Sequence, residues 1–278
     1  MPGPAAALKG RRFWKMTGSG NDFVFFDARE GMPPGAEAPE TIRALCSRTD
    51  GIGADGVVWL ETAVAAGADF AIRYYNRDGS RGELCGNASL CSSNLSIALG
   101  MAAPSGLTFL TDVGAIAARV TSGLPEIDLN PVQGLRADAG FALATGEQRI
   151  GFANTGVPHL VVLVADAEAV DLPPRGRELR FHPAVLPAGA NVNFVSAAGS
   201  RWRMRTYERG VEGETLACGT GSVATAALLV VWGLAAPGEV EIVTTSGRSL
   251  VPTIPSAGGK PSLRGEGRVV FEGVVGDI

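Results

Sequence analysis

Glu83-Leu84-Cys85-Gly86-Asn87 and Leu216-Ala217-Cys218-Gly219-Thr220 each place a Cys-Gly pair directly before a long run of small and apolar residues. The two runs also have the same length, because each cysteine is followed by a glycine fifteen residues later, Gly100 in one case and Gly233 in the other. Such runs without proline favour a helix that is enclosed closely on several sides. Each cysteine is therefore predicted to stand immediately before a buried helix.

The residues upstream of the two cysteines repeat as well. Arg73-Tyr74-Tyr75-Asn76-Arg77 matches Arg205-Thr206-Tyr207-Glu208-Arg209, with one residue's difference in the distance to the cysteine. The chain has 278 residues, which exceeds the usual size of one domain. We interpret the pattern as a duplication and predict two domains, 1–130, completed by the C-terminal strand 266–278, and 131–265.

Composition excludes several classes of protein. The chain is 46% hydrophobic and 19% charged, with a formal net charge of −4, so it can bury a large core and offers no broad basic face for nucleic acid. The start of the chain has no apolar signal region, and the longest nearly apolar run, 223–236, is too short to cross a bilayer. We therefore expect a cytoplasmic protein with no membrane or nucleic-acid partner.

Short strand-like segments alternate with glycine and proline turns in both halves. Helices are predicted at 38–46 and after each cysteine, the first of these over 86–99, whereas 171–177 is interpreted as a proline-rich connection and 125–134 as the crossover between domains. The expected strands are 13–16, 23–26, 57–60, 69–75, 107–111, 116–120, 127–129, 148–153, 160–164, 192–196, 202–207, 240–244 and 269–271. This order predicts an α/β protein of the α+β type, with two pseudo-symmetric domains that each wrap a β-barrel-like sheet round a central helix.

Two local patterns suggest sites that we reject. Gly51-Ile52-Gly53-Ala54-Asp55-Gly56 matches the glycine fingerprint of dinucleotide-binding proteins, but a polar segment precedes it and a predicted strand follows it, which is the reverse of the required context. The four cysteines form no C-x-x-C pair and the chain has only two histidines, so neither a metal site nor a disulfide framework is expected.

A cysteine at the start of a helix stands where unpaired N–H groups and the helix dipole favour an anion, either its own thiolate or a substrate carboxylate. The dipole alone lowers the pKa of a thiol by only about one unit from roughly 8.5, so a neighbouring group must assist. His159 and Glu208 are the candidates for this group. A lone histidine is most often structural, and a carboxylate beside an arginine, as Glu208 is beside Arg209, is by default part of an ion pair.

The duplication predicts that the two thiols face one small ligand from opposite sides of the cleft between the domains. Opposed thiols suit the inversion of a stereocentre, in which one sulfur removes a proton from one face and the other returns a proton to the opposite face. Cys85 and Cys218 are therefore the predicted catalytic acid and base, and their titrations would be coupled.

The chain resembles the diaminopimelate epimerases, which belong to the cofactor-independent two-thiol racemase group. The matching motifs follow the family order over almost the whole chain. They are Gly18-Ser19-Gly20-Asn21-Asp22-Phe23, the glycine-rich 51–56, Asn76-Arg77-Asp78-Gly79-Ser80, Cys85-Gly86-Asn87, Pro158-His159, Asn191-Val192-Asn193-Phe194, Tyr207-Glu208-Arg209-Gly210 and Gly213-Glu214-Thr215-Leu216-Ala217-Cys218-Gly219-Thr220-Gly221.

The resemblance implies an epimerase that interconverts LL- and meso-2,6-diaminopimelate with no cofactor and no metal. We also expect a homodimer. By the same resemblance, backbone N–H groups at the two helix starts hold the carboxylate next to the reacting carbon, and polar side chains bind the distal, non-reacting end of the substrate. His159 and Glu208 would tune the thiols, with Glu208 also near the substrate amine. The residues carried over are Gly86, Asn87, Gly219 and Thr220 for the carboxylate, and Asn21, Asn76, Asn191 and Arg209 for the distal end.

The chain departs from the commonest family pattern at several positions. Val157 stands where the family usually has asparagine, so that contact is missing or comes from elsewhere, for example Asn154. Ala88 and Leu90 replace a glycine and an arginine found in many members, and Gly56 stands where some members have a glutamine contact.

These departures leave other functions open. A racemase of the same fold acting on histidine or proline is the nearest alternative, followed by an isomerase of the phenazine-biosynthesis type, which does not use two cysteines. A cysteine hydrolase using Cys218 and His159 would leave Cys85 unexplained, and a binding module would carry two oxidisable thiols without purpose.

Overall fold

The computed structural model describes residues 3–82, 84–256 and 258–278, so Glu83 of the first cysteine stretch lies outside the described residues. The chain divides into two compact units, which we call the first unit (Met1–Ile127 with Glu266–Ile278) and the second unit (Asp128–Gly265). The domain division predicted from the sequence stays a proposal, and this clustering of contacts supports it.

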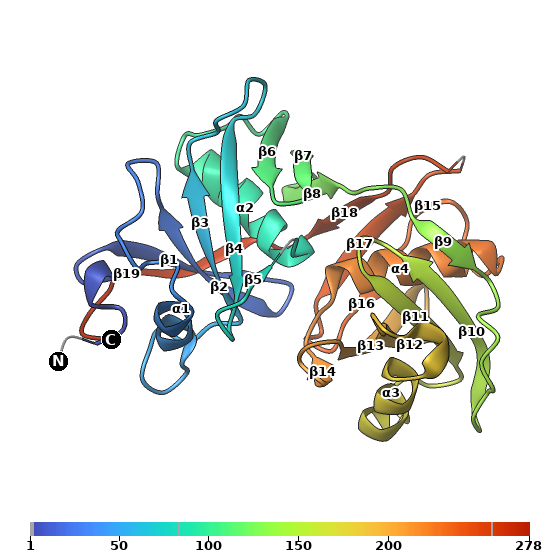
Figure 1. The fold of residues 1–278 in the computed structure, drawn as a ribbon. Helices are drawn as coiled ribbons and strands as arrows, with labels where there is room; N and C mark the ends of the chain where they lie inside the picture. Colours follow the sequence, from blue (N-terminus) through green and yellow to red (C-terminus); the bar gives the residue numbers. More distant parts are fainter. Residues whose placement is uncertain (1–2, 83, 257) are drawn as a thin grey trace. The chain divides into compact units, whose positions relative to one another are not determined.

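The first unit is one continuous run of paired strands in the order β19-β1-β2-β3-β4-β6-β7-β8, with β5 paired to β4. The β2–β3 and β4–β6 pairs are parallel and the others are antiparallel (Figure 1). The strands are β1 (Arg12–Gly18), β2 (Asn21–Asp27), β3 (Gly56–Glu61), β4 (Phe70–Asn76), β5 (Arg81–Gly82), β6 (Leu107–Thr111), β7 (Gly114–Thr121), β8 (Leu124–Asp128) and β19 (Arg268–Val274), and the α-helices are α1 (Pro39–Cys46) and α2 (Gly86–Ala98).

The second unit repeats this connectivity as β9-β10-β11-β12-β13-β16-β17-β18, with parallel pairs at β11–β12 and β13–β16. The strands are β9 (Gln133–Arg136), β10 (Glu147–Asn154), β11 (Pro158–Val164), β12 (Asn191–Ala198), β13 (Arg201–Glu208), β14 (Gly213–Thr215), β15 (Gly238–Glu239), β16 (Ile242–Val243), β17 (Ser249–Ile254) and β18 (Ser262–Gly265), and the α-helices are α3 (Leu172–Arg180) and α4 (Gly219–Val231). The matching strand orders and parallel pairs confirm the predicted duplication and fold class.

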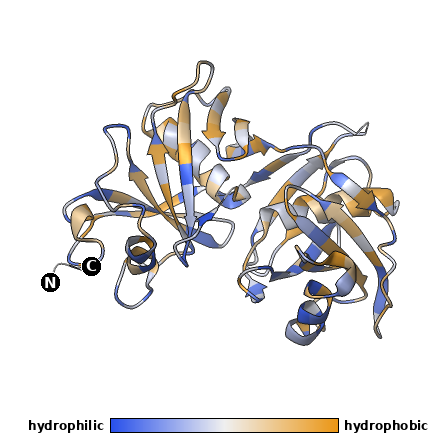
Figure 2. Ribbon diagram, in the orientation of Figure 1, coloured by the Kyte–Doolittle hydropathy of each residue, from blue (hydrophilic) through white to orange (hydrophobic). Residues whose placement is uncertain are grey.

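In each unit the sheet surrounds the helix that follows the cysteine. Helix α2 contacts β1, β3, β4, β7 and β19, and α4 contacts β10, β11, β12, β17 and β18. Small residues allow the close approach: a Cβ at Gly151 on β10 would lie 2.6 Å from Leu228 Cδ2 of α4. Figure 2 shows α4 as largely apolar, as a helix buried on all sides requires. No helix in the described ranges is long and apolar enough to cross a membrane.

Helix α3 shows that one sequence interpretation was wrong. The segment 171–177, read as a proline-rich connection, forms most of this helix. Its prolines, Pro173 and Pro174, stand in the first turn, where a missing N–H costs no helical hydrogen bond and the fixed φ suits the helix. Gly176 lets α3 pack on β13, since a Cβ there would lie 2.6 Å from Tyr207 Cβ.

The last part of the second unit also differs from the prediction. Of the strand expected at 240–244, only β16 forms. The glycine- and proline-rich region 252–260 was expected to separate the last two strands, but it contains the end of β17. In β17 the alternate residues Leu250, Pro252 and Ile254 are buried, so the proline occupies an inward position of a regular strand. Strand β18, which pairs with it, was not predicted.

Candidate active site

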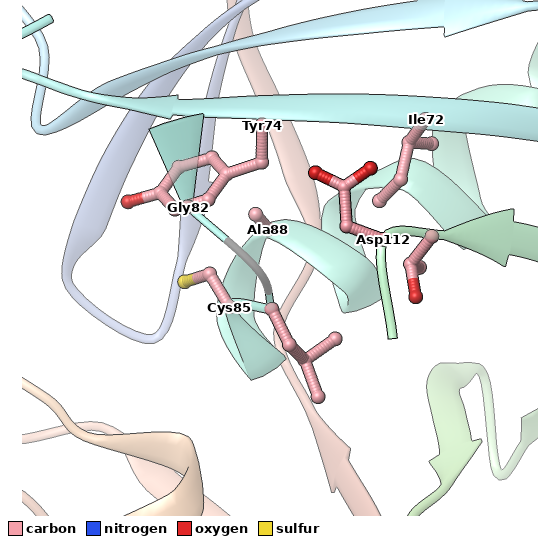
Figure 3. Close-up of a pocket in the computed structure, with 8 residues that line it drawn as sticks. Ile72, Tyr74, Gly82, Cys85, Ala88 and Asp112 are labelled. Atoms are coloured by element: carbon pink, nitrogen blue, oxygen red, sulfur yellow. The ribbon is translucent and has the colours of Figure 1, made fainter. Parts of the chain in front are cut away.

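Cys85 is the N-cap residue of α2, with an extended backbone at φ −129° and ψ 116°. The first helical bond runs from Ser89 N to the Cys85 carbonyl oxygen, 2.9 Å away, so the helix itself offers no acceptor to the N–H groups of Gly86 and Asn87. The half-buried Cys85 side chain lines a small pocket together with Tyr74 and other residues of β4, β5, β6 and α2 (Figure 3). This geometry suits an anion at the helix start.

The Asn21 side chain joins the helix start to β2. Its Oδ1 accepts a 2.6 Å hydrogen bond from Asn87 Nδ2, and its Nδ2 donates to Asp55 Oδ2 at 3.2 Å. Arg48 links this carboxylate to that of Asp22 through 2.8 and 2.7 Å contacts. Burial opposes the ionisation of Asp22, but the hydrogen bonds from Arg48 and Lys15 outweigh it and lower its pKa to about 2. A charged network thus fixes the orientation of the Asn21 amide.

Asn76 ends β4 and is held at both ends of its amide. Its Oδ1 accepts a 2.9 Å hydrogen bond from the Tyr74 hydroxyl, and its Nδ2 donates to Ser80 Oγ at 3.1 Å. A side chain at Gly56, on the neighbouring strand, has no room, because its Cβ would lie 2.6 Å from Tyr74 Cε2. The tyrosine ring therefore fills the space in which a larger residue would stand at position 56.

Cys218 occupies the equivalent N-cap of α4, with φ −137° and ψ 108°, and Ser222 N donates to its carbonyl oxygen at 3.0 Å. Its sulfur lies 3.7 Å from Thr220 Oγ1, which in turn lies 3.1 Å from His159 Nε2. Asn193 Nδ2 contacts His159 Nδ1 at 3.1 Å, on the other side of the ring. A chain of polar contacts therefore leads from the interior of the sheet to the cysteine.

The hydrogen bonds determine which nitrogen of His159 carries the proton. Asn193 Nδ2 donates to the Leu160 carbonyl oxygen and its Oδ1 accepts from Thr206 Oγ1, so the amide orientation is fixed. Nδ1 of the histidine must then accept, and Nε2–H donates to Thr220 Oγ1. The Thr220 hydroxyl keeps its own proton to donate to the Cys218 sulfur, and a hydrogen bond of this kind favours the thiolate over the thiol.

His159 acts as a neutral ring in this chain of contacts. The residue is fully buried, and burial, with a smaller contribution from the charge of Arg209, lowers the pKa of its imidazole to about 3. At neutral pH it therefore offers Cys218 no positive charge. Its influence on the thiol reaches the sulfur through the Thr220 hydroxyl.

Glu208 and Arg209 follow each other at the end of β13 and are held differently. Glu208 Oε2 accepts a 2.7 Å hydrogen bond from Thr215 Oγ1 on β14. Arg209 N donates to Asn191 Oδ1 at 2.8 Å, and its guanidinium reaches the Ala188 carbonyl oxygen at 3.3 Å. The structure therefore places the Asn191 side chain against the backbone of Arg209.

The other two cysteines are unsuited to proton transfer. Burial raises the pKa of the Cys46 thiol to about 12 and that of the Cys91 thiol well above its ordinary range. Both remain protonated at neutral pH and are inert packing residues. Within 3–82, 84–256 and 258–278, no group of three or more His, Cys, Asp or Glu side chains is arranged to hold a metal ion.

Sequence reasoning missed three polar side chains of the site: Tyr74, Asn193 and Thr206. Asn193 belongs to the Asn191–Phe194 motif, and the period of two in a strand places it on the face opposite to that of Val192 and Phe194, toward the helix. Asn154, considered as a substitute for the asparagine that Val157 replaces, accepts a 3.0 Å hydrogen bond from Gly156 N in the turn before β11. That bond uses one of the two acceptor sites of the Asn154 amide oxygen.

Comparisons with known proteins show the family of the chain. The family model described as diaminopimelate epimerase matches residues 13–127 and 151–271. A diaminopimelate epimerase from Gemmatimonas aurantiaca is 51% identical over 277 residues, covering 96% of this chain and 99% of the relative.

Solved structures of similar fold have low sequence identity. A phenazine biosynthesis protein of the PhzF family from Bacillus anthracis matches with a TM-score of 0.70 at 14% identity, over 95% of this chain and 98% of that one. A hydroxyproline epimerase from Agrobacterium vitis matches with a TM-score of 0.68 at 20% identity, over 96% and 93%. These two likenesses concern the fold alone, whereas the family model and the relative span nearly the whole sequence: the chain belongs to the diaminopimelate epimerase family.

Proposed function

We propose that the protein is an isomerase that interconverts LL- and meso-2,6-diaminopimelate by proton transfer at one α-carbon. The observation that carries the proposal is the pair of N-cap cysteines, Cys85 and Cys218, at equivalent positions of two duplicated units. Membership of the diaminopimelate epimerase family supports the substrate. A place in lysine and cell-wall precursor biosynthesis follows from that substrate.

The reaction needs one base and one acid. One cysteine, as thiolate, removes the α-proton, so that the C–H bond breaks and an S–H bond forms. The thiol of the other cysteine then delivers its proton to the opposite face of the carbanion and becomes a thiolate. The two roles exchange for the reverse reaction, and the pair titrates as a unit.

The helix starts supply the binding groups for the carboxylate at the reacting carbon. The backbone N–H groups of Gly86, Asn87, Gly219 and Thr220 suit this anion, because the helices offer them no acceptor. When the α-proton leaves, the negative charge of the carbanion spreads onto the carboxylate oxygens. The N–H groups that hold these oxygens therefore also lower the energy of the carbanion.

Side chains bind the rest of the substrate. Asn21, Asn76, Asn191 and Arg209 bind its distal end, where the Arg209 guanidinium pairs with the second carboxylate. Glu208 lies beside Arg209 and is assigned to the substrate amine. His159 acts on Cys218 through Thr220. The amide contacts of Asn21, Asn76 and Asn191 with neighbouring residues fix their orientation in advance.

The experiment is hydrogen exchange in D₂O. Purified protein is incubated separately with LL- and meso-diaminopimelate, and deuterium at the α-carbon is followed together with the ratio of isomers. We expect exchange and interconversion with both isomers. A Cys85→Ala/Cys218→Ala double variant, prepared in the same way, controls for an epimerase carried over from the expression host.

The same assay separates the alternatives. Exchange with neither isomer would overturn the assignment, and exchange with histidine or proline alone would indicate a racemase of the same fold. An isomerase of the phenazine-biosynthesis type would retain its activity in the double variant, because it does not depend on the two cysteines.

We also propose that the protein acts in the cytoplasm and forms a homodimer. Its acidic net charge and its small-molecule substrate are compatible with the first. Sedimentation of the purified protein tests the second, and a species of 28.6 kDa at all concentrations would contradict it.

A further inference from the structure

The face of β4 that looks toward α2 carries a tyrosine next to the catalytic cysteine. Alternate residues of a strand point to opposite sides, so Tyr74 shares its face with Ile72 and Asn76, while Arg73 and Tyr75 point the other way. Figure 3 shows Tyr74, Ile72 and Cys85 lining one pocket. The Tyr75 hydroxyl instead contacts Glu37, away from this pocket.

Two glycines make room for the Tyr74 ring and fix its position. A Cβ at Gly56 would lie 2.6 Å from Tyr74 Cε2, and a Cβ at Gly82 would lie 2.4 Å from Tyr74 Cδ1. Phe23 packs edge-on against the same ring at 6.1 Å between centroids. The ring is therefore enclosed by β2, β3 and β5, which leaves its hydroxyl little freedom of position.

The hydroxyl acts on one atom of a predicted substrate-binding residue. It donates a 2.9 Å hydrogen bond to Asn76 Oδ1, while Asn76 Nδ2 donates to Ser80 Oγ at 3.1 Å. An amide has two acceptor sites and two N–H groups, so these bonds use one of each. The Ser80 hydroxyl donates to Asp78 Oδ1, so it accepts from Asn76 Nδ2, and this decides which end of the amide is the oxygen. The Tyr74 hydroxyl then holds that oxygen in place.

We propose that Tyr74 is a positioning residue that fixes the amide of Asn76 for binding the distal end of the substrate. This inference rests on the proposed function, because Asn76 binds that distal end only if diaminopimelate is the substrate. Without the hydroxyl, the oxygen of the Asn76 amide is no longer held, so the amide can rotate away from the position that binds the substrate for part of the time. Binding weakens, whereas the cysteines and the proton transfer are unchanged.

The test is Tyr74→Phe, which removes the hydroxyl and keeps the ring, with Tyr75→Phe as the matched control on the opposite face. A single neutral hydrogen bond is lost, so we expect KM for diaminopimelate to rise about five-fold in Tyr74→Phe, with kcat within about two-fold of wild type. Tyr75→Phe should leave KM unchanged. Thermal unfolding of both variants shows whether the fold is intact.

A double variant separates positioning from general loosening of the pocket. Because Tyr74 acts through Asn76, adding Tyr74→Phe to Asn76→Ala should change KM no further. Additive effects, or equal KM values in Tyr74→Phe and Tyr75→Phe, would overturn the inference while the proposed function stands. Absence of exchange in the wild-type protein would overturn both.

Discussion

The two units place their cysteines alike but surround them with different chemistry. In the first unit, the inner face of the sheet carries Phe23, Val58 and Tyr74, which come from the neighbouring strands β2, β3 and β4. Phe23 and Tyr74 pack edge-on, and the only polar atom of the three side chains, the Tyr74 hydroxyl, is directed to Asn76. Cys85 therefore shares its pocket with an aromatic ring, that of Tyr74.

In the second unit, the equivalent positions of β11, β12 and β13 carry His159, Asn193 and Thr206. These three side chains form an unbroken hydrogen-bonded series that continues through Thr220 to the Cys218 sulfur. The duplicated backbone thus fixes the positions of the two cysteines, and the side chains of three strands decide the polarity around each sulfur.

The largest effect is expected from removing either sulfur, which tests whether the two units share the chemistry equally. Cys85→Ala and Cys218→Ala should each reduce epimerisation by about 10²- to 10⁴-fold, because a positioned acid or base contributes that much. The rate of isomer interconversion measures the loss. Cys46→Ala, which alters a buried cysteine in the first unit's core, should keep nearly full activity.

Full activity in either single variant would show that one unit alone performs the proton transfer. The duplication would then concern the fold alone, and the two cysteines would not share the catalytic role.

A smaller effect is expected from cutting the polar series of the second unit. Thr220→Val keeps the backbone N–H and the shape but removes the hydroxyl between His159 and Cys218. A hydrogen bond to a charged group contributes about 1.5–3 kcal/mol, so kcat should fall by about 10- to 100-fold. Thr225→Val, in the same helix, is the matched control, because the Thr225 hydroxyl contacts Met204 Sδ of β13 and not the cysteine.

Equal kcat values for the two threonine variants would mean that the Thr220 hydroxyl does not act on the sulfur. The environments of Cys85 and Cys218 would then be equivalent for catalysis despite their different side chains.

An element of the fold could be predicted from the sequence only where its residue pattern allows few alternatives. The cysteine helices were predictable, because long apolar runs without proline allow few alternatives to a buried helix. Helix α3 was missed because prolines count against a helix except in its first turn, and the position of that turn is set by packing on Tyr207. Strand β17 was missed for a similar reason at Pro252.

For the candidate site, the sequence indicated residues but not the contacts between them. His159 and Thr220 are 61 residues apart in sequence, and only the packing of α4 against β11 brings them together. The family resemblance assigned a backbone role to Thr220 and a thiol-tuning role to His159. The tautomer of His159, and with it the part played by the Thr220 hydroxyl, follows only from the orientation of the Asn193 amide.

The smallest expected effect concerns stability and isolates the buried histidine that distinguishes the second unit. His159 has a pKa of about 3 when folded and about 6.5 when unfolded, so below pH 6.5 the unfolded chain binds a proton that the native protein does not. Its contribution is constant above that pH and falls as the pH drops toward 3. At pH 5.5 the loss is about 1.4 kcal/mol relative to pH 7.5.

Urea unfolding at the two pH values measures this change in the free energy of unfolding. The His159→Asn variant should show a smaller loss than the wild type by about that amount, since carboxylates such as Asp22 titrate alike in both proteins. If His159→Asn retained the wild-type pH dependence, the imidazole would bind its proton in the native protein as readily as in the unfolded chain. Cys218 would then lie near a cation at pH 5.5, and its contrast with Cys85 would become one of charge as well as of hydrogen bonding.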